Sequence, residues 1–265
     1  MSLLHIICLA LVQGLTEFLP VSSSGHLILF SSLTNMQDQG VGVDVALHIG
    51  SLFAVLIYFR TEIANMIKEV LKDKLLPNFK HAYNRLAYLL IVGSIPALIV
   101  GGGLRNYGME FLRNPKIIGF TILFYGLVLY AADKFGKSER GLKDLNLKDA
   151  LLIGLAQCLA LVPGTSRSGI TITMARFLKI SRVDAAKFSM MLSIPVIAAA
   201  GCLEGYRMFM ANEAGEIWVA LDAVMFSFVA SYLVIYLMME WLKRFTYVPF
   251  VVYRVILGLL LIILA

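Results

Sequence analysis

Residues 13–26 read QGLTEFLPVSSSGH and interrupt an apolar region that runs from residue 3 to residue 34. A glutamate, a proline and three consecutive serines stand where the flanking residues are mostly hydrophobic. The apolar segments on either side are about 8–14 residues long, shorter than the roughly 20 residues that a membrane-crossing helix needs. Broken helices are tolerated at membrane depth only where protein or a water-filled cavity surrounds them. The pattern therefore predicts a re-entrant helix–loop–helix hairpin over residues 3–34.

A second interruption, PGTSRSG at residues 163–169, divides the apolar region 150–178 in the same way. We interpret it as a second re-entrant hairpin. A shift of 144 positions superimposes the two interruptions, and the matched pairs are Gln13/Gln157, Leu15/Leu159, Ser22/Ser166, Ser24/Ser168 and Gly25/Gly169. Two related hairpins that enter from opposite faces are typical of inverted-topology repeats, whose site lies where the broken helices meet.

The composition indicates a protein that is immersed in lipid. Of 265 residues, 59% are hydrophobic and 15% are charged, against about 45–50% and 25% in soluble domains. These values exclude disordered, collagen-like and disulfide-rich secreted classes. We therefore predict an all-α polytopic membrane protein with six transmembrane helices plus the two hairpins. The predicted spans are 44–60, 86–104, 117–133, 183–205, 218–241 and 248–265, with solvated loops between them, including 61–85.

The positions of the lysines and arginines predict the orientation. With the N-terminus outside and both hairpins returning to their own side, seventeen of these residues fall in inside segments and four, Arg105 among them, in outside segments. This asymmetry follows the positive-inside rule. The chain then forms a single integral-membrane domain, residues 1–265. One repeat spans about residues 1–133 and the other about 150–265, and a cytoplasmic loop, 134–149, joins them. The net charge of +6 belongs to this pattern and does not indicate nucleic-acid binding.

Glu17 is the first candidate for chemistry, because a carboxylate at membrane depth is costly and usually functional. Gln13 lies four residues earlier, so both side chains share one helix face. Amide and carboxylate oxygens are the ligands that hard divalent cations prefer. The alternative is that Glu17 is hydrogen-bonded only for packing.

The two serine–glycine runs, Ser22–Gly25 and Ser166–Gly169, each precede the second half-helix of a hairpin. Helix N-termini favour anions, and the fork of Arg167 suits a phosphate, so the runs predict a site for a lipid phosphate or diphosphate. Helix capping is the simpler alternative. His26 follows the first run and is a candidate nucleophile, general acid–base or ligand. His48 is a candidate supporting residue, and Asp44, near a predicted helix start, is interpreted as a cap or dipole partner.

With both motifs in place, the sequence resembles the bacterial undecaprenyl-diphosphate phosphatases, also called bacitracin resistance proteins, from end to end. The resemblance implies hydrolysis of the C55 isoprenoid diphosphate to the monophosphate, which recycles the lipid carrier for peptidoglycan synthesis. It also implies a divalent cation, Mg²⁺ or Ca²⁺, and a site that opens toward the periplasm. The expected location is the bacterial inner membrane, as a multi-pass protein with both termini in the periplasm.

The resemblance also carries residue roles onto this sequence. Glu17 and Gln13 are expected to bind the metal, and Glu17, Ser23, His26 and Arg167 form the expected catalytic group. Ser23 and His26 compete for the role of nucleophile. The expected substrate-binding residues are Ser22, Ser24, Gly25, Gly164, Ser166, Ser168, Gly169 and Thr171.

The expected partners are a polyprenyl diphosphate lipid and the bilayer, with no nucleic acid, and a homodimer is left open. Because inverted repeats with broken helices are also transporter architecture, the main alternative is a lipid-phosphate flippase that uses the same site. A structural membrane scaffold is the third reading, and it leaves Glu17 and Arg167 without a role.

Overall fold

A computed structural model describes residues 2–34, 40–104, 110–211 and 217–264 of the chain. Within these ranges the chain forms helices and no strand, which confirms the all-α prediction. The α-helices are α1 (Leu3–Thr16), α2 (Ser23–Thr34), α3 (Gly40–Tyr58), α4 (Arg60–Lys72), α5 (Ala82–Leu104), α6 (Pro115–Phe135), α7 (Leu147–Cys158), α8 (Arg167–Phe177), α9 (Arg182–Ala211), α10 (Ile217–Leu242) and α11 (Val248–Leu264). Short 3₁₀ turns lie at Glu110–Arg113, Leu142–Asp144 and Leu159–Leu161.

Five of the six predicted spans correspond to helices that are long and apolar enough to cross a membrane, namely α3, α5, α6, α9 and α10. The sixth, α11, is apolar but shorter, with 17 residues. The chain is thus an apolar helical protein of the polytopic membrane class. Arg105, one of the basic residues in the charge argument, lies outside the described residues.

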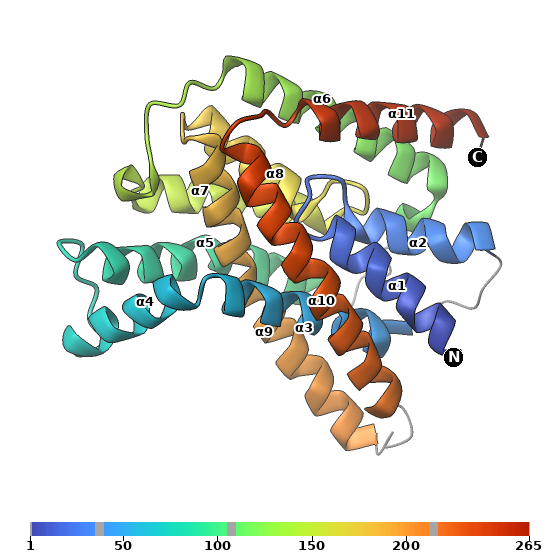
Figure 1. Cartoon of the computed structure of the whole chain (residues 1–265), viewed down its shortest axis with the longest axis horizontal. Coiled ribbons are helices and arrows are strands. Elements are labelled where there is room, and N and C mark those ends of the chain that lie inside the picture. Colours follow the sequence, from blue (N-terminus) through green and yellow to red (C-terminus); the bar gives the residue numbers. More distant parts are fainter. Residues whose placement is uncertain (1, 35–39, 105–109, 212–216, 265) are drawn as a thin grey trace.

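Both predicted interruptions are present as breaks between short helices. A first tip, residues 17–22, joins α1 to α2, and a second tip, residues 159–166, joins α7 to α8. In Figure 1 each pair of helices doubles back, and the two tips come together at the centre of the molecule. The ends of the described chain, Ser2 and Leu264, lie on one side of this centre, whereas α4 and the segment before α7 lie on the opposite side.

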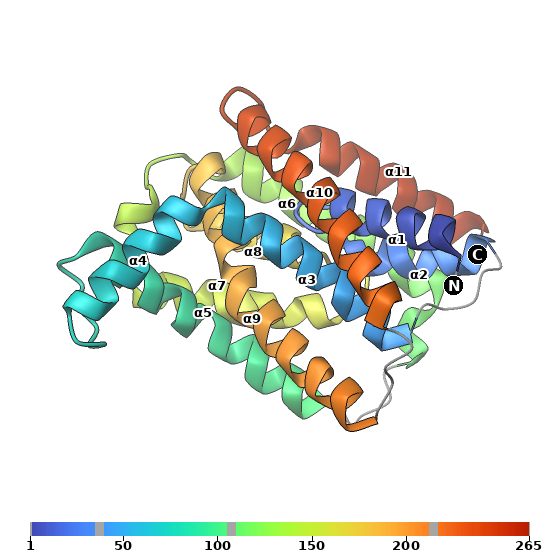
Figure 2. The ribbon, with the colours of Figure 1, turned by 60° about the horizontal axis from the view of Figure 1, so that its bottom comes forward.

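Segment 61–85 is not the solvated loop that we expected. It contains α4, an amphipathic helix whose residues Ile63, Met66, Ile67 and Val70 repeat at the spacing of one helix face. Figures 1 and 2 show α4 lying beside α5. The mixture of lysines and glutamates in the segment masked this apolar stripe. Lys68 and Lys72 of α4 are exposed, whereas Glu62 pairs with Lys187 of α9 and Glu69 accepts the backbone N–H of Tyr83 in α5.

Close packing against α10 fixes the positions of α1 and α3. A Cβ atom built on Gly14 would lie 2.9 Å from the backbone nitrogen of Ser231, and one built on Gly50 would lie 2.9 Å from the backbone nitrogen of Phe228. The hydroxyl of Ser51 in α3 bonds those of Ser227 and Ser231 at 3.2 and 2.9 Å. Small residues and interhelical hydroxyl bonds are the usual means of helix association in membranes, and here they hold the two helices that approach the first tip.

Candidate functional site

The two tips share an uncommon backbone conformation. Ser22 has φ of +79° and Ser166 has φ of +72°, a region that few residues other than glycine adopt and that is enriched at functional sites. Each serine hydroxyl then accepts the backbone N–H three residues ahead, from Gly25 at 3.3 Å and from Gly169 at 3.0 Å. The equivalence of Ser22 and Ser166 predicted from the sequence is therefore confirmed in local geometry.

Glu17 lies at the junction of the two tips. Its Oε1 accepts a hydrogen bond from Nη2 of Arg167 at 3.0 Å. Its Oε2 accepts bonds from the Ser23 hydroxyl at 2.7 Å and from Nε2 of Gln13 at 3.0 Å. The side chain is 5% exposed, so the ion pair is shielded from solvent and screened little. The structure thus joins an acid, a hydroxyl and an arginine from the two hairpins.

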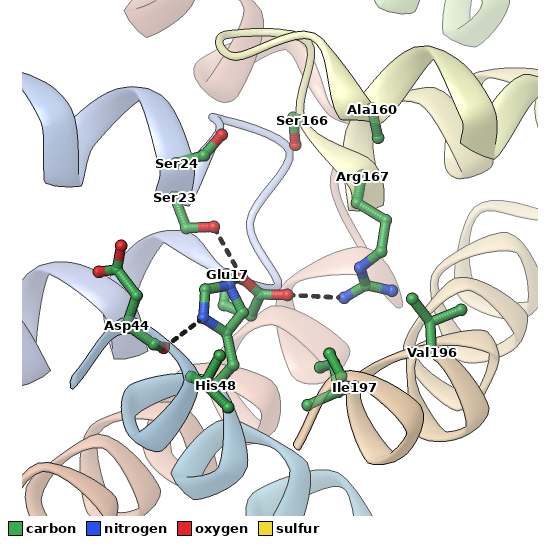
Figure 3. A pocket seen from close by; sticks show the side chains of 12 residues that line it. Glu17, Ser23, Ser24, Asp44, His48, Ala160, Ser166, Arg167, Val196 and Ile197 are labelled. Carbon is green, nitrogen blue, oxygen red and sulfur yellow. Dashed lines mark hydrogen bonds and ion pairs between the residues drawn. The ribbon is translucent and has the colours of Figure 1, made fainter. Parts of the chain in front are cut away.

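These groups form part of the wall of a pocket of about 290 Å³. Figure 3 shows Glu17 at its base, with Ser23 and Arg167 on either side and His48 in front. The lining residues are Glu17, Ser23, Ser24, Asp44, Val45, His48, Ala160, Ser166, Arg167, Val196, Ile197 and Ala200. Polar groups therefore face apolar ones across the pocket, which suits a molecule with an anionic head and an apolar chain.

Arg167 is held in place from two directions. While Nη2 contacts Glu17, Nη1 donates to the carbonyl of Ser189 in α9 at 3.0 Å. Thr171 bonds the Ser189 hydroxyl at 2.7 Å, and Ser168 donates across to the carbonyl of Leu19 in the first tip at 3.0 Å. Ser168 therefore links the two hairpins and Thr171 links α8 to α9, and neither residue lines the pocket.

The predicted glycines also build the tips and do not line the pocket. Gly164 has φ of +90°, and a Cβ atom there would collide with the Thr121 hydroxyl. That hydroxyl donates to the carbonyl of Pro163 at 2.7 Å. Gly25, Gly169 and Ser22 take part in the capping bonds described above. Of the residues expected to bind substrate, Ser24 and Ser166 line the pocket.

His26 does not line this pocket. Its Nδ1 lies 2.6 Å from the carbonyl of Ser22, and its Nε2 lies 2.6 Å from the hydroxyl of Tyr253 in α11. Because a carbonyl only accepts, Nδ1 carries a proton, and the neutral ring accepts the Tyr253 hydroxyl at Nε2. The ring thus points toward α11. A direct role for His26 in catalysis stays a prediction.

Two residues of α3 take a larger part in the site than the sequence indicated. His48 Nε2 lies 3.5 Å from Glu17 Oε2, and its Nδ1 donates to the Asp44 carbonyl at 2.7 Å. Asp44 is the fifth residue of α3 and lines the pocket, so it is not the helix cap that we expected. The sequence feature that could have indicated this role is the four-residue spacing of Asp44 and His48, which places both side chains on one helix face.

Arg254, an arginine inside the last apolar span, is not among the site residues predicted from the sequence. Its guanidinium is fully buried and donates to Pro20 of the first tip at 3.0 Å, to Gly164 and Thr165 of the second tip at 3.1 Å, and to Ile122 of α6 at 2.9 Å. All these acceptors are backbone carbonyls, and no carboxylate among the described residues pairs with it. Arg254 therefore satisfies the irregular backbone of both hairpins at once.

Replacing Arg254 with Met should lower the thermal unfolding midpoint of the protein in detergent strongly. Each buried carbonyl left without a donor costs about 1–3 kcal/mol, and several lose their donor together. Arg254→Lys should recover only part of the loss in unfolding midpoint. A lysine still donates hydrogen bonds, but its ammonium group cannot spread its donors over both tips. The control is Arg244→Met at an exposed position. An unchanged midpoint in Arg254→Met would show that the tips do not depend on this residue.

The residues around Glu17 fit a hard divalent cation only in part. Carboxylates of Glu17 and Asp44 and the Ser23 hydroxyl supply oxygen donors in one pocket, whereas Gln13 presents its Nε2 to Glu17, and its buried Oε1 has no hydrogen-bond partner. Among the described residues no three His, Cys, Asp or Glu side chains group as a complete metal cage. This donor set suits a cation that keeps waters and takes substrate phosphate oxygens, as Mg²⁺ does.

The fold and the pocket define a polytopic membrane protein with a buried candidate site for an anionic group. The family model for bacitracin resistance protein BacA matches residues 6–260, and the chain belongs to this family. Similar curated proteins carry the name undecaprenyl-diphosphatase. One from Alteromonas mediterranea is 46% identical over 261 residues, 98% of each chain. Another from Roseobacter denitrificans is 47% identical over 274 residues and covers 100% of this chain and 99% of its own.

Proposed function

We propose that this chain is an undecaprenyl-diphosphatase, an integral membrane enzyme that converts undecaprenyl diphosphate to undecaprenyl phosphate and inorganic phosphate. The observation that carries the proposal is Glu17, held between the Ser23 hydroxyl and Arg167 at the wall of a pocket to which both tips contribute. Relatives of that name match nearly the whole chain. Recycling of the lipid carrier and bacitracin resistance follow from this activity.

The charges in the pocket support binding of a diphosphate. Phosphoryl transfer depends mainly on positioning and on neutralising the equatorial oxygens. Arg167 supplies the positive charge and a fork that fits phosphate oxygens. The N-terminus of α8, which begins at Arg167, and that of α2, which begins at Ser23, both lie at the tips and favour an anion there.

The hydrogen bond between Ser23 and Glu17 supports Ser23 as the nucleophile. Ser23 Oγ attacks the terminal phosphorus, its proton passes to Glu17 Oε2, and the bond from that phosphorus to the bridging oxygen breaks, which releases undecaprenyl phosphate. Water then attacks the phosphoserine, the bond from phosphorus to Ser23 Oγ breaks, and Glu17 returns the proton to Ser23 Oγ. Both protons of the water leave with the inorganic phosphate. A serine next to a base is the usual arrangement of an activated hydroxyl. His26, the competing candidate, contacts Tyr253 instead.

We also propose a divalent cation, Mg²⁺ or Ca²⁺, that is held by Glu17 with Asp44 nearby. The Oε1 atom of Gln13 would join them if the side-chain amide flips. When bound, such a cation neutralises charge on the phosphate oxygens. Glu17 would then both bind the cation and accept the proton of Ser23. Arg167 would bind the phosphate group from the opposite side.

Removing divalent cations should stop the reaction. We expect the purified chain in detergent to release inorganic phosphate from undecaprenyl diphosphate, a chelator to reduce this at least 100-fold, and added Mg²⁺ or Ca²⁺ to restore it. The measurement is phosphate release per lipid, with a heat-inactivated sample as control. A flippase has no activity without two compartments, so binding of the lipid without phosphate release would favour transport. Full phosphate release in the presence of the chelator would contradict the proposed requirement for a divalent cation.

For the membrane topology we propose six crossings, by α3, α5, α6, α9, α10 and α11, with both hairpins re-entrant and both termini in the periplasm. Two observations support it. The basic segments around α4 and before α7 lie at the opposite end from Ser2 and Leu264 (Figure 1), and lysine and arginine accumulate on the cytoplasmic side. The pocket would then receive the lipid head group from the periplasmic side.

A further inference from the structure

Two further cavities lie away from the Glu17 pocket, where α4, α5 and α9 meet. The larger one, about 350 Å³, is lined only by apolar side chains, including Met66, Leu90 and Met191. Its rim residues Ile67 and Ile91 are exposed on the outer surface of the protein. Met191 and Val196 lie on the same helix, and α9 therefore separates this cavity from the Glu17 pocket, which Val196 lines.

The smaller cavity, about 200 Å³, has a charged wall that contains Arg85, Lys143, Lys187 and Glu62. It adjoins the apolar cavity, because neighbouring residues on two helices line the two cavities: Glu62 and Ile63 on α4, and Leu86 and Ala87 on α5.

The charged cavity has an excess of positive charge. Lys187 pairs with Glu62 at 2.6 Å, whereas Arg85 contacts the backbone carbonyl of Lys143. Within the described residues neither Arg85 nor Lys143 pairs with a carboxylate. Three cations thus face one carboxylate, and the two cations outside the ion pair are free to meet an anion. One end of the combined site suits an anionic head group, and the other suits an alkyl chain.

We propose that these adjoining cavities bind an anionic phospholipid of the bilayer, with its phosphate diester at Arg85 and Lys143 and an acyl chain between α4, α5 and α9. Basic pockets between membrane helices on the cytoplasmic side are known binding places for anionic lipid head groups. The cavities are lined by α4 and by the first turns of α5 and α9. Figures 1 and 2 show α4 at the end of the molecule that also carries the segment before α7, the end rich in lysine and arginine. A bound lipid would connect α4 to α9.

The test is native mass spectrometry of the purified full chain with phosphatidylglycerol. The head-group variant is Arg85→Gln with Lys143→Gln, and the tail variant is Ala87→Phe, which fills the apolar cavity without a change of charge. The matched control is Lys80→Gln with Lys137→Gln, which removes the same charge from exposed positions of the same end. We expect the head-group and tail variants each to lose at least fivefold in the lipid-bound fraction, and the control to keep the value of the unchanged chain.

Phosphate release and the thermal unfolding midpoint, measured on every variant, show that the fold is retained. If Ala87→Phe unfolds, Ala87→Leu takes its place. Equal lipid binding by the head-group variant and the control would overturn the proposal, as would equal binding of phosphatidylcholine and phosphatidylglycerol by the unchanged chain. Preferential binding of a polyprenyl phosphate at the same residues would assign the cavities to the product lipid instead.

Discussion

Glu17→Gln should lower phosphate release from undecaprenyl diphosphate by about 10²–10⁴-fold, the range expected for loss of a general base. The amide keeps the size of the side chain and an oxygen that can face Arg167, but it can no longer take the Ser23 proton. It is also a weaker ligand for a cation. The measurement is the initial rate of phosphate release at saturating lipid, which reports the chemical step.

Two further variants separate chemistry from folding. Glu240→Gln removes an exposed carboxylate that pairs with Lys243 and should leave the rate unchanged. Glu17→Asp keeps the charge but shortens the side chain, so it should fold and retain more activity than Glu17→Gln. A rate in Glu17→Gln within threefold of the unchanged chain would refute the role of Glu17.

Arg167→Ala should reduce kcat/KM by about 10²–10³-fold, as removal of one group that stabilises transition-state charge does. The loss should appear in both KM and kcat, because the guanidinium is expected to bind the diphosphate and to stabilise its developing charge. Arg167→Lys should recover a minor part, since a lysine keeps the charge but not the planar fork that reaches both Glu17 and Ser189.

The control for Arg167→Ala is Arg207→Ala, which removes an exposed arginine from the far end of α9. It should leave kcat/KM unchanged. Near-normal turnover by purified Arg167→Ala would remove the main support for the proposed function, because no other arginine or lysine lines the pocket among the described residues.

The hairpins and the meeting of Glu17 with Arg167 could be predicted from the sequence. Helices too short to span a membrane have few arrangements open to them, and two related interruptions that are predicted to enter from opposite faces are expected to bring their polar tips to a common centre. The ion pair between residues 150 positions apart follows from that topology. The shared positive φ of Ser22 and Ser166 shows that this matched pair has the same local backbone conformation.

The details that depend on tertiary packing could not be predicted in this way. The orientation of His26 toward Tyr253 and the contribution of Asp44 to the pocket depend on how α2 and α3 rotate against their neighbours. Arg254 lies in an apolar run that was read as a plain span, yet it serves carbonyls of three separate elements. The helix α4 escaped notice because its charges outweighed its apolar stripe.

The central claim is that the two tips form one site, and a double-mutant cycle between Glu17→Gln and Arg167→Ala tests it most directly. Phosphate release from undecaprenyl diphosphate is measured for the unchanged chain, both single variants and the double variant. Residues that act as a unit are strongly non-additive, so we predict that the double variant is about as slow as the slower single variant. Losses that multiply in the double variant would show that Glu17 and Arg167 act independently, and would contradict a shared site.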